Sequence, residues 1–208
     1  MSQKKRVAIY IDGFNLYHAI ADLNDNRLKW LNLVALGRSF LRDQERLVKC
    51  QYFTTIVDWN LGKRAKHEAY VRALEAQGAI VTHGTFKQSR RHCSRTGNQC
   101  PFREEKQTDV AIGIAMVADA FNDVFDRLIL VTADTDQIPA IRMVMDQRPQ
   151  KLITWAAPPG RMRLARELGA LISDRFEMTR GQIGTCRLPK VVRDAQNSIV
   201  AQMPADYG

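Results

Sequence analysis

The pattern of hydrophobic and polar positions predicts an alternation of buried strands and helices. Five short runs are apolar and rich in β-branched residues, which is typical of strands buried on both faces of a parallel sheet. Helical patterns separate most of these runs, as the crossover connections of a parallel sheet require. The sequence therefore predicts an α/β fold. The predicted strands are Val7–Ile11, Val48–Thr55, Ala79–Phe86, Leu128–Thr132 and Lys151–Trp155, and a sixth is expected near Leu171–Phe176.

Capping residues indicate where the helices begin and end. Gly78 is suited to end a helix because glycine adopts the left-handed backbone conformation at low cost. Thr108 is suited to cap one because its hydroxyl can accept a hydrogen bond from a free amide in the first turn. The helices predicted in this way are 62–77, Asp109–Asn122, a helix that starts at Asp134 or Thr135 and runs through Met145, and Arg161–Leu168, which would end at Gly169.

Two segments depart from this alternation. The segment 87–107 is basic, contains Cys93, Cys100 and Pro101, and is expected to be a long loop inserted into the domain. The residues after Gly184 are expected to form a tail. A chain of 208 residues fits one domain. We therefore expect one domain over residues 1–184, with the basic loop insertion at about 87–107, followed by a C-terminal tail over 185–208.

Acidic residues follow two of the predicted strands directly. Asp12 follows Val7–Ile11, and Asp134 and Asp136 follow Leu128–Thr132. In open α/β sheets, ligands bind beyond the carboxyl ends of the strands, near the point where the strand order reverses. If these two strands are neighbours there, the three carboxylates converge. Asp109, which opens the most apolar helix of the chain, could supply a fourth.

Converging carboxylates either take up protons or hold a cation. Hard oxygen ligands with open positions suit Mg²⁺ or Mn²⁺, which bind substrate phosphates and can activate a water molecule. The alternative is structural, because a single Asp after a strand is more often a helix cap or a turn former. Acids at two strand ends, together with an acid at the start of a buried helix, favour the metal-binding interpretation.

The net charge of the chain is +9, which makes a polyanion such as nucleic acid the leading class of partner. The basic insertion could hold the phosphates of a strand, although it could also be a solvated loop. Phe86, Phe102 or Trp155 could stack a base, with core packing as the alternative. The candidate nucleic-acid-binding residues are Lys87, Arg90, Arg91, Arg95, Arg103 and Lys106.

The cysteines and the N-terminus say little about function. Cys93 and Cys100 lie near His83 and His92, but the two close pairs of ligands that structural zinc sites use are missing, so reduced thiols are the expectation. No window approaches the roughly 18 apolar residues of a membrane span. The apolar run Val7–Ile11 is too short for a signal sequence. A cytoplasmic location without membrane attachment is expected.

Three motifs resemble the NYN branch of the PIN-like nucleases. They are Tyr10–Leu16 (YIDGFNL), Glu105–Val110 (EKQTDV) and Thr132–Ile141 (TADTDQIPAI), in the right order over about residues 6–180. The resemblance implies a Rossmann-like three-layer sandwich with the strand order 3-2-1-4-5. It also implies an acidic cluster that holds Mg²⁺ or Mn²⁺ and hydrolysis of RNA.

The resemblance also implies roles for particular residues. Asp12, Asp109, Asp134 and Asp136 would form the acidic, metal-binding catalytic centre. Asn15 would orient a carboxylate, a metal-bound water or the substrate, although it could equally be an ordinary residue at a helix start.

One position departs from the family pattern. Many relatives carry another acid two turns into the helix that Asp109 opens, where this chain has Ile114, Ala115 and Met116. Asp119 lies about 80° from the face of Asp109 and some 15 Å along the axis, so it is a poor substitute. The departure leaves open whether one metal or two are bound.

The leading hypothesis is an endoribonuclease acting on single-stranded or loop RNA. The alternative is an RNA-binding protein with the same fold and weak or no cleavage. A phosphatase is disfavoured, because Phe14 stands where that mechanism needs a second Asp after Asp12. The sequence leaves the oligomeric state open, including a homo-oligomer.

Overall fold

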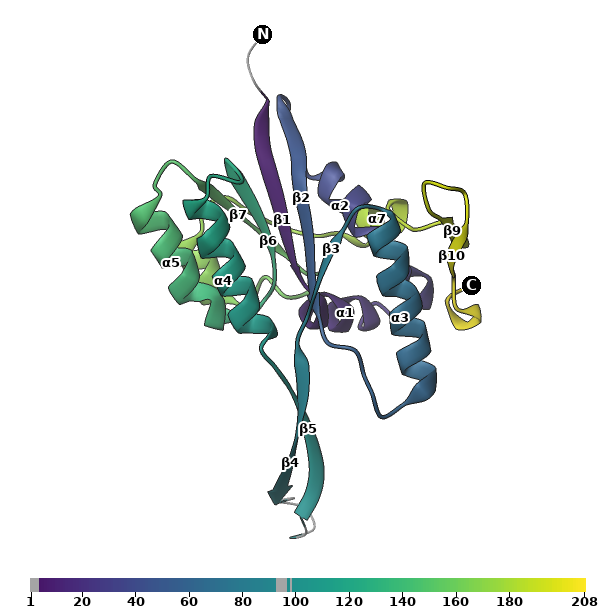
Figure 1. The fold of residues 1–208 in the computed structure, drawn as a ribbon. Coiled ribbons are helices and arrows are strands. Elements are labelled where there is room, and N and C mark those ends of the chain that lie inside the picture. Colours follow the sequence, from purple (N-terminus) through teal and green to yellow (C-terminus); the bar gives the residue numbers. More distant parts are fainter. Residues whose placement is uncertain (1–3, 93–96, 98) are drawn as a thin grey trace.

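The computed structural model describes residues 4–92, 97 and 99–208, and only the backbone of residues 89–92 and 99–102. Its centre is a six-stranded sheet in the order β3-β2-β1-β6-β7-β8, in which every neighbouring pair is parallel (Figure 1). The strands are β1 (Lys5–Asp12), β2 (Glu45–Thr54), β3 (Ile80–His83), β6 (Arg127–Val131), β7 (Leu152–Ala157) and β8 (Arg175–Glu177).

Helices cover both faces of the sheet, so the fold is the expected α/β three-layer sandwich (Figure 1). Side chains of β1 alternate between the two faces, as the period of a strand requires. Val7, Ile9 and Ile11 belong to one core cluster, whereas Ala8 and Tyr10 belong to the other. The first cluster packs under α1 (Gly13–Ala21), α2 (Leu33–Ser39), α3 (Leu61–Ala76) and α7 (Arg180–Thr185), and the second under α4 (Thr108–Phe121), α5 (Ile138–Gln147) and α6 (Arg166–Leu171).

The five predicted strands are present. The predicted order 3-2-1-4-5 corresponds to β3-β2-β1-β6-β7, and β8 adds a strand at the edge. The third predicted strand is in fact two, because the chain turns at Gly84 between β3 and β4. Strand order places β1 between β2 and β6, so the ends of β1 and β6 are neighbours.

The predicted basic loop is a β-hairpin instead. It consists of β4 (Thr85–His92) and β5 (Gln99–Lys106), which pair antiparallel from Thr85↔Lys106 outward and extend away from the body of the molecule (Figure 1). The sequences of its two strands, TFKQSRRH and QCPFREEK, are mostly polar. The apolar alternation that marks a half-buried strand is therefore missing from its sequence.

Two helix predictions also need correction. Thr108 is the first residue of α4 rather than its cap, and Gln107 precedes the helix in a left-handed conformation with φ 78°. Residues 161–165 form turns in which Leu164 and Ala165 both bond to the carbonyl of Arg161, so α6 begins only at Arg166. The helix then continues past Gly169, where a Cβ atom would lie 3.4 Å from the ring of Trp155. Gly169 therefore serves close packing.

Residues 185–208, expected as a tail, contribute to the core. After α7 the chain forms the hairpin of β9 (Val191–Arg193) and β10 (Ile199–Gln202), and Val192 and Ala201 are buried in the first core cluster beside α3. Within the described residues, no helix has the length and apolar character that crossing a bilayer demands.

Candidate active site

Asp12 is the last residue of β1 and is almost fully buried. Its Oδ1 accepts a hydrogen bond from the backbone N–H of Asn15 at 3.0 Å, so Asp12 also caps α1. The sharp exit from the strand requires Gly13, because a Cβ there would lie 2.6 Å from the carbonyl oxygen of Phe53 on β2. The strand, the cap and the glycine together fix the carboxylate at the carboxyl edge of the sheet.

The second oxygen of Asp12 is held by two side chains. Asn15 donates its amide to Oδ2 at 2.5 Å, and Thr132 donates its hydroxyl to the same atom at 2.8 Å. The Oδ1 of Asn15 accepts from the backbone N–H of Ala133 at 3.2 Å. Asn15 therefore connects the end of β1 to the loop after β6, and it orients Asp12.

Asp134 and Asp136 lie in that loop. The hydroxyl of Thr132 accepts from the N–H of Asp134 at 3.0 Å, and Oδ1 of Asp134 accepts from the N–H of Asp136 at 2.9 Å. Asp134 thereby caps the short 3₁₀ helix Thr135–Gln137 that leads into α5. Asp134 is partly exposed and Asp136 is exposed, so both can turn toward a ligand at the sheet edge.

Asp109 completes a group of four carboxylates. It is half-buried in the first turn of α4, and burial raises the pKa of its carboxyl to about 6, with the negative charges of Asp134, Asp12 and Asp136 adding to the effect. Burial also raises the pKa of Asp12. The four acids that the sequence singled out therefore lie near enough for the charges of Asp12, Asp134 and Asp136 to act on Asp109.

Glu105 is a fifth acid that the sequence analysis did not assign to the site. It lies on β5, and its Oε1 accepts from the hydroxyls of Thr55, at 3.1 Å, and Thr108. Burial raises its pKa, and the charges of Asp109 and Asp12 raise it further. Both threonines are almost fully buried. Its spacing from Asp109, four residues within one motif, was the available signal.

The carboxylates suit a hard divalent cation by their donor chemistry. Among the described residues, the charges that act on the pKa of Asp109 are those of Asp134, Asp12 and Asp136, which are all negative and repel the carboxylate. Within the described residues, no three acidic, His or Cys side chains are grouped closely enough to chelate one ion directly. Mg²⁺ is commonly held by one or two carboxylates and several waters, which fits this looser arrangement.

Carboxylate repulsion should make the metal-free protein less stable as pH rises. A carboxyl with a raised folded pKa binds more protons in the folded than in the unfolded state between its two pKa values. Stability should therefore fall between about pH 4 and the folded pKa of about 6. In EDTA, Asp109→Asn should have a higher Tm than the wild type at pH 7.5, and the difference should shrink at pH 4.5. A Tm difference that is independent of pH would contradict the repulsion.

Asp119 does not substitute for the missing acid of α4. Its carboxylate pairs with Lys49 at 2.5 Å and accepts a hydrogen bond from the hydroxyl of Tyr10. This network ties α4 to β1 and β2. Ala115, in the stretch where the resemblance implies a further acid, packs against the second core cluster.

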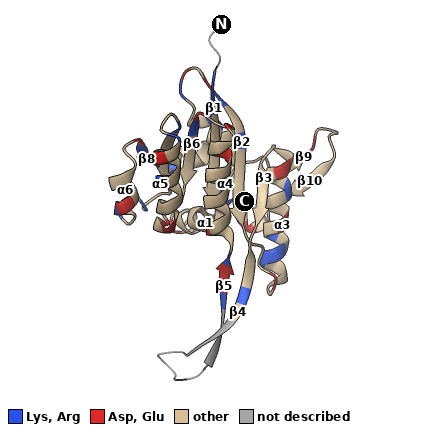
Figure 2. Cartoon of the chain, turned by 60° about the vertical axis from the view of Figure 1, so that its left-hand side comes forward, with Lys and Arg blue, Asp and Glu red and all other residues tan. Residues whose placement is uncertain are grey.

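The predicted nucleic-acid-binding residues lie on the hairpin. Basic residues lie on both strands of the hairpin near the body of the molecule (Figure 2). Lys87 and Lys106 are exposed near its base, and Lys106 pairs with Glu104 at 3.0 Å. Arg103 pairs with Asp58 at 3.2 Å. Arg90 and Arg91 lie on β4 with side chains outside the described part, and Arg95 lies outside the described residues altogether, as do Cys93 and the side chains of Cys100 and Phe102.

Burial distinguishes two of the aromatic residues that were predicted to stack a base. Trp155 is fully buried and donates its indole N–H to the carbonyl of Thr132 at 2.8 Å, so it supports the site from within the core and cannot stack a base. Phe86 lies on β4 of the hairpin and is partly exposed.

A parallel α/β sheet with carboxylates gathered beyond the ends of two adjacent central strands defines a Rossmann-like protein with an acidic centre at its switch point. The chain matches the model of the NYN domain over residues 6–167 and belongs to the NYN family. Members of this family are generally nucleases, which supports a hydrolase that acts on nucleic acid.

Two further proteins resemble the chain. The first is 6-hydroxy-3-succinoylpyridine 3-monooxygenase HspA from Pseudomonas putida, which is 22% identical over 92% of this chain and 72% of its own length. The second is a protein of unknown function from Vibrio parahaemolyticus. Its crystal structure aligns with a TM-score of 0.57 and 20% identity over 86% of this chain and 96% of that one. The second similarity supports the fold.

Proposed function

We propose that this protein is a metal-dependent ribonuclease that cuts single-stranded or loop RNA internally. The observation that carries the proposal is the convergence of Asp12, Asp109, Asp134 and Asp136 at the carboxyl edge of the sheet, where burial and mutual repulsion raise the pKa of Asp109 to about 6. Because the carboxylates repel one another when no cation is bound, binding of a cation stabilises the site.

Each residue has a distinct part in the proposed reaction. Asp12, held by Asn15 and Thr132, is the fixed ligand, and Asp134, Asp136 and Asp109 are the adjustable ones. A bound Mg²⁺ or Mn²⁺ would activate water and neutralise charge on the phosphate. Glu105, whose pKa is raised by burial, lies beside Asp109 and can exchange a proton with a water or a leaving oxygen. The net charge of +9 favours a polyanionic substrate.

The test is cleavage of an end-labelled, partly structured RNA with Mg²⁺, Mn²⁺ or EDTA. We expect internal cuts with metal and none in EDTA. Asp134→Asn should lower the rate by about 100-fold, because three carboxylates remain to hold the metal less well. The matched control is Asp146→Asn, an exposed acid on α5, which should cut at the wild-type rate. Full activity of Asp134→Asn would refute the assigned centre.

A second candidate is an RNA-binding protein that does not cut. Two observations favour it: Ile114, Ala115 and Met116 supply no acid where the resemblance implies one, and Asp119 is engaged with Lys49 and Tyr10. This candidate predicts RNA affinity that falls steeply with salt and RNA that stays intact with every metal.

A further inference from the structure

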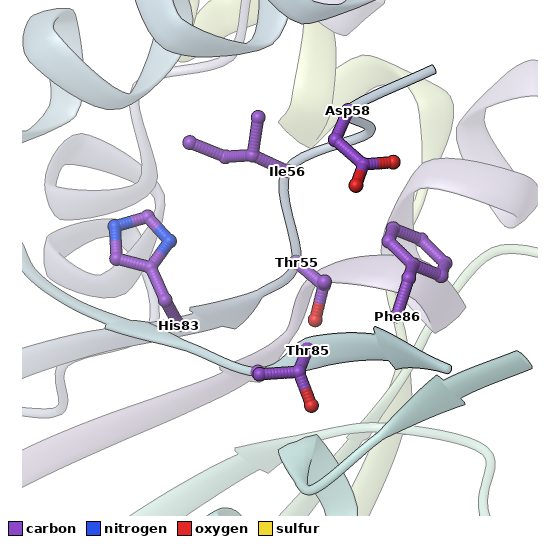
Figure 3. A pocket seen from close by; sticks show the side chains of 7 residues that line it. Thr55, Ile56, Asp58, His83, Thr85 and Phe86 are labelled. Atoms are coloured by element: carbon purple, nitrogen blue, oxygen red, sulfur yellow. The ribbon is translucent and has the colours of Figure 1, made fainter. Parts of the chain in front are cut away.

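An open hollow lies beside the acidic centre, at the carboxyl ends of β2 and β3. Its volume is about 390 Å³, within the roughly 300–1,000 Å³ of small-ligand sites. Polar groups of Thr55, Asp58, His83 and Thr85 line it together with Phe86. Figure 3 shows His83 on one side and Asp58 and Phe86 on the other, with the two threonines between them. Such a lining combines an aromatic surface with several hydrogen-bonding groups.

The hollow and the acidic centre are connected through Thr55 and Glu105. Thr55, which lines the hollow, donates its hydroxyl to Glu105, and the charges of Asp109 and Asp12 act on Glu105. Gly84 makes this close approach feasible, because a Cβ there would lie 2.5 Å from the hydroxyls of both Thr55 and Thr108. A ligand that occupies the hollow is therefore next to the carboxylates.

Phe86, which lines the hollow, belongs to a chain of aromatic rings that we call the rim. Phe86 packs edge-to-face against Phe14, with ring centroids 5.9 Å apart, and against Trp59, with centroids 4.6 Å apart. Phe14 is only two residues beyond Asp12. Trp59 keeps 44% of its surface exposed, and the guanidinium of Arg103 lies 4.2 Å from the centre of its ring. Arg103 is held there by Asp58.

We propose that this rim and hollow form a base-stacking site for single-stranded RNA, in which Trp59 stacks the base of a nucleotide next to the phosphate at the acidic centre. The inference rests on the proposed function. Exposed aromatic rings beside cationic groups are the means by which proteins bind single strands, because every base has a stacking face. A base in a duplex is already stacked and paired, so the site selects unpaired RNA.

The basic residues around the hollow favour binding of a nucleic-acid strand. The hairpin that carries Phe86 and Arg103 also carries Lys87, and the start of α3, just beyond Trp59, carries further basic residues (Figure 2). A strand that leaves the acidic centre past Phe14 reaches Phe86 and then Trp59. The phosphates would face the basic positions while one base turns into the hollow.

The test is RNA binding by the Asp134→Asn protein in EDTA. The substitution and the removal of metal together keep the RNA uncut during the measurement. Adding Trp59→Ala should weaken binding of a single-stranded RNA roughly 5- to 150-fold. Adding Trp59→Phe instead should retain most of the affinity. The salt dependence should keep its slope, because no phosphate contact is removed. The matched control is Phe121→Ala at the far end of α4, where Arg148 lies 4.0 Å from the ring centre, and it should bind as the parent does.

Tryptophan fluorescence supplies a second readout. Trp30 and Trp155 are fully buried, so a bound base reaches only Trp59. RNA should quench the emission, and an RNA with a run of abasic sugars should bind more weakly without quenching. Equal affinities of Trp59→Ala and the control, or no quenching on binding, would overturn the stacking site while leaving cleavage untouched. Absence of any RNA binding by the parent would overturn both the stacking site and the proposed function.

Discussion

Replacing Asp12 by asparagine is expected to lower metal-dependent RNA cleavage by roughly 10³-fold or more. A catalytic metal contributes several kcal/mol of transition-state stabilisation, and each 1.36 kcal/mol is tenfold in rate. Asp12 is the most deeply buried of the four carboxylates and the only one fixed by two side chains. Its loss should therefore exceed that of Asp134, which can be compensated by neighbours that move.

The fold of the Asp12→Asn protein should survive. Asparagine is as good a helix cap as aspartate, and its oxygen can still accept from the N–H of Asn15. Cleavage rate and Tm should be measured together. Asp43→Asn, an exposed acid before β2 at the opposite edge of the sheet, is the control and should match the wild type in both. A variant that retains more than a tenth of the activity would show that Asp12 is not a metal ligand.

Arg127→Met is expected to lower the free energy of unfolding by about 3–5 kcal/mol, because removal of the guanidinium leaves the buried carboxylate of Glu45 without a partner. Arg127 and Glu45 are both almost fully buried, and the guanidinium donates through Nε to Glu45 at 2.8 Å and through Nη2 to the same carboxylate. It also donates to the hydroxyl of Thr154 and the carbonyl of Phe40. This pair fastens β6 to the start of β2.

The double variant Arg127→Met with Glu45→Leu separates the loss of the ion pair from the cost of leaving the Glu45 carboxylate buried without a partner. It should recover much of the lost stability, since two apolar groups of similar size often replace a buried ion pair at little cost. Urea unfolding of the two single variants and the double variant would measure this. A loss below 1 kcal/mol for Arg127→Met would mean that water reaches the carboxylate of Glu45.

The central strands could be predicted from sequence because they are buried on both faces. Residues such as Ile9 and Leu130 face two packed layers, and the resulting continuous apolar runs have no other common explanation. The acids of the site were visible for the same reason, since Asp12 and Asp134 end such runs abruptly. Their convergence depended on strand order, which the family motifs supplied.

Other features depend on contacts between distant residues. Thr55, Glu105 and Thr108 meet only because the hairpin returns to the end of β2, and no local pattern encodes that meeting. Arg127 stands at the border of an apolar run, where a charged residue normally marks the boundary with solvent. Only its pairing with Glu45, 82 residues earlier, explains its burial. The hairpin was missed because its mostly polar sequence lacks the apolar alternation of a half-buried strand.

The place of β1 between β2 and β6 has a consequence for synthesis of the protein. Asp12 is translated 120 residues before its partner Thr132. The ribosome adds Asp136, the last of the four carboxylates, only after the strands β1, β2, β3 and β6 have been synthesised. For a ribonuclease of the proposed kind, this order keeps the nascent chain inactive until Asp136 has been synthesised.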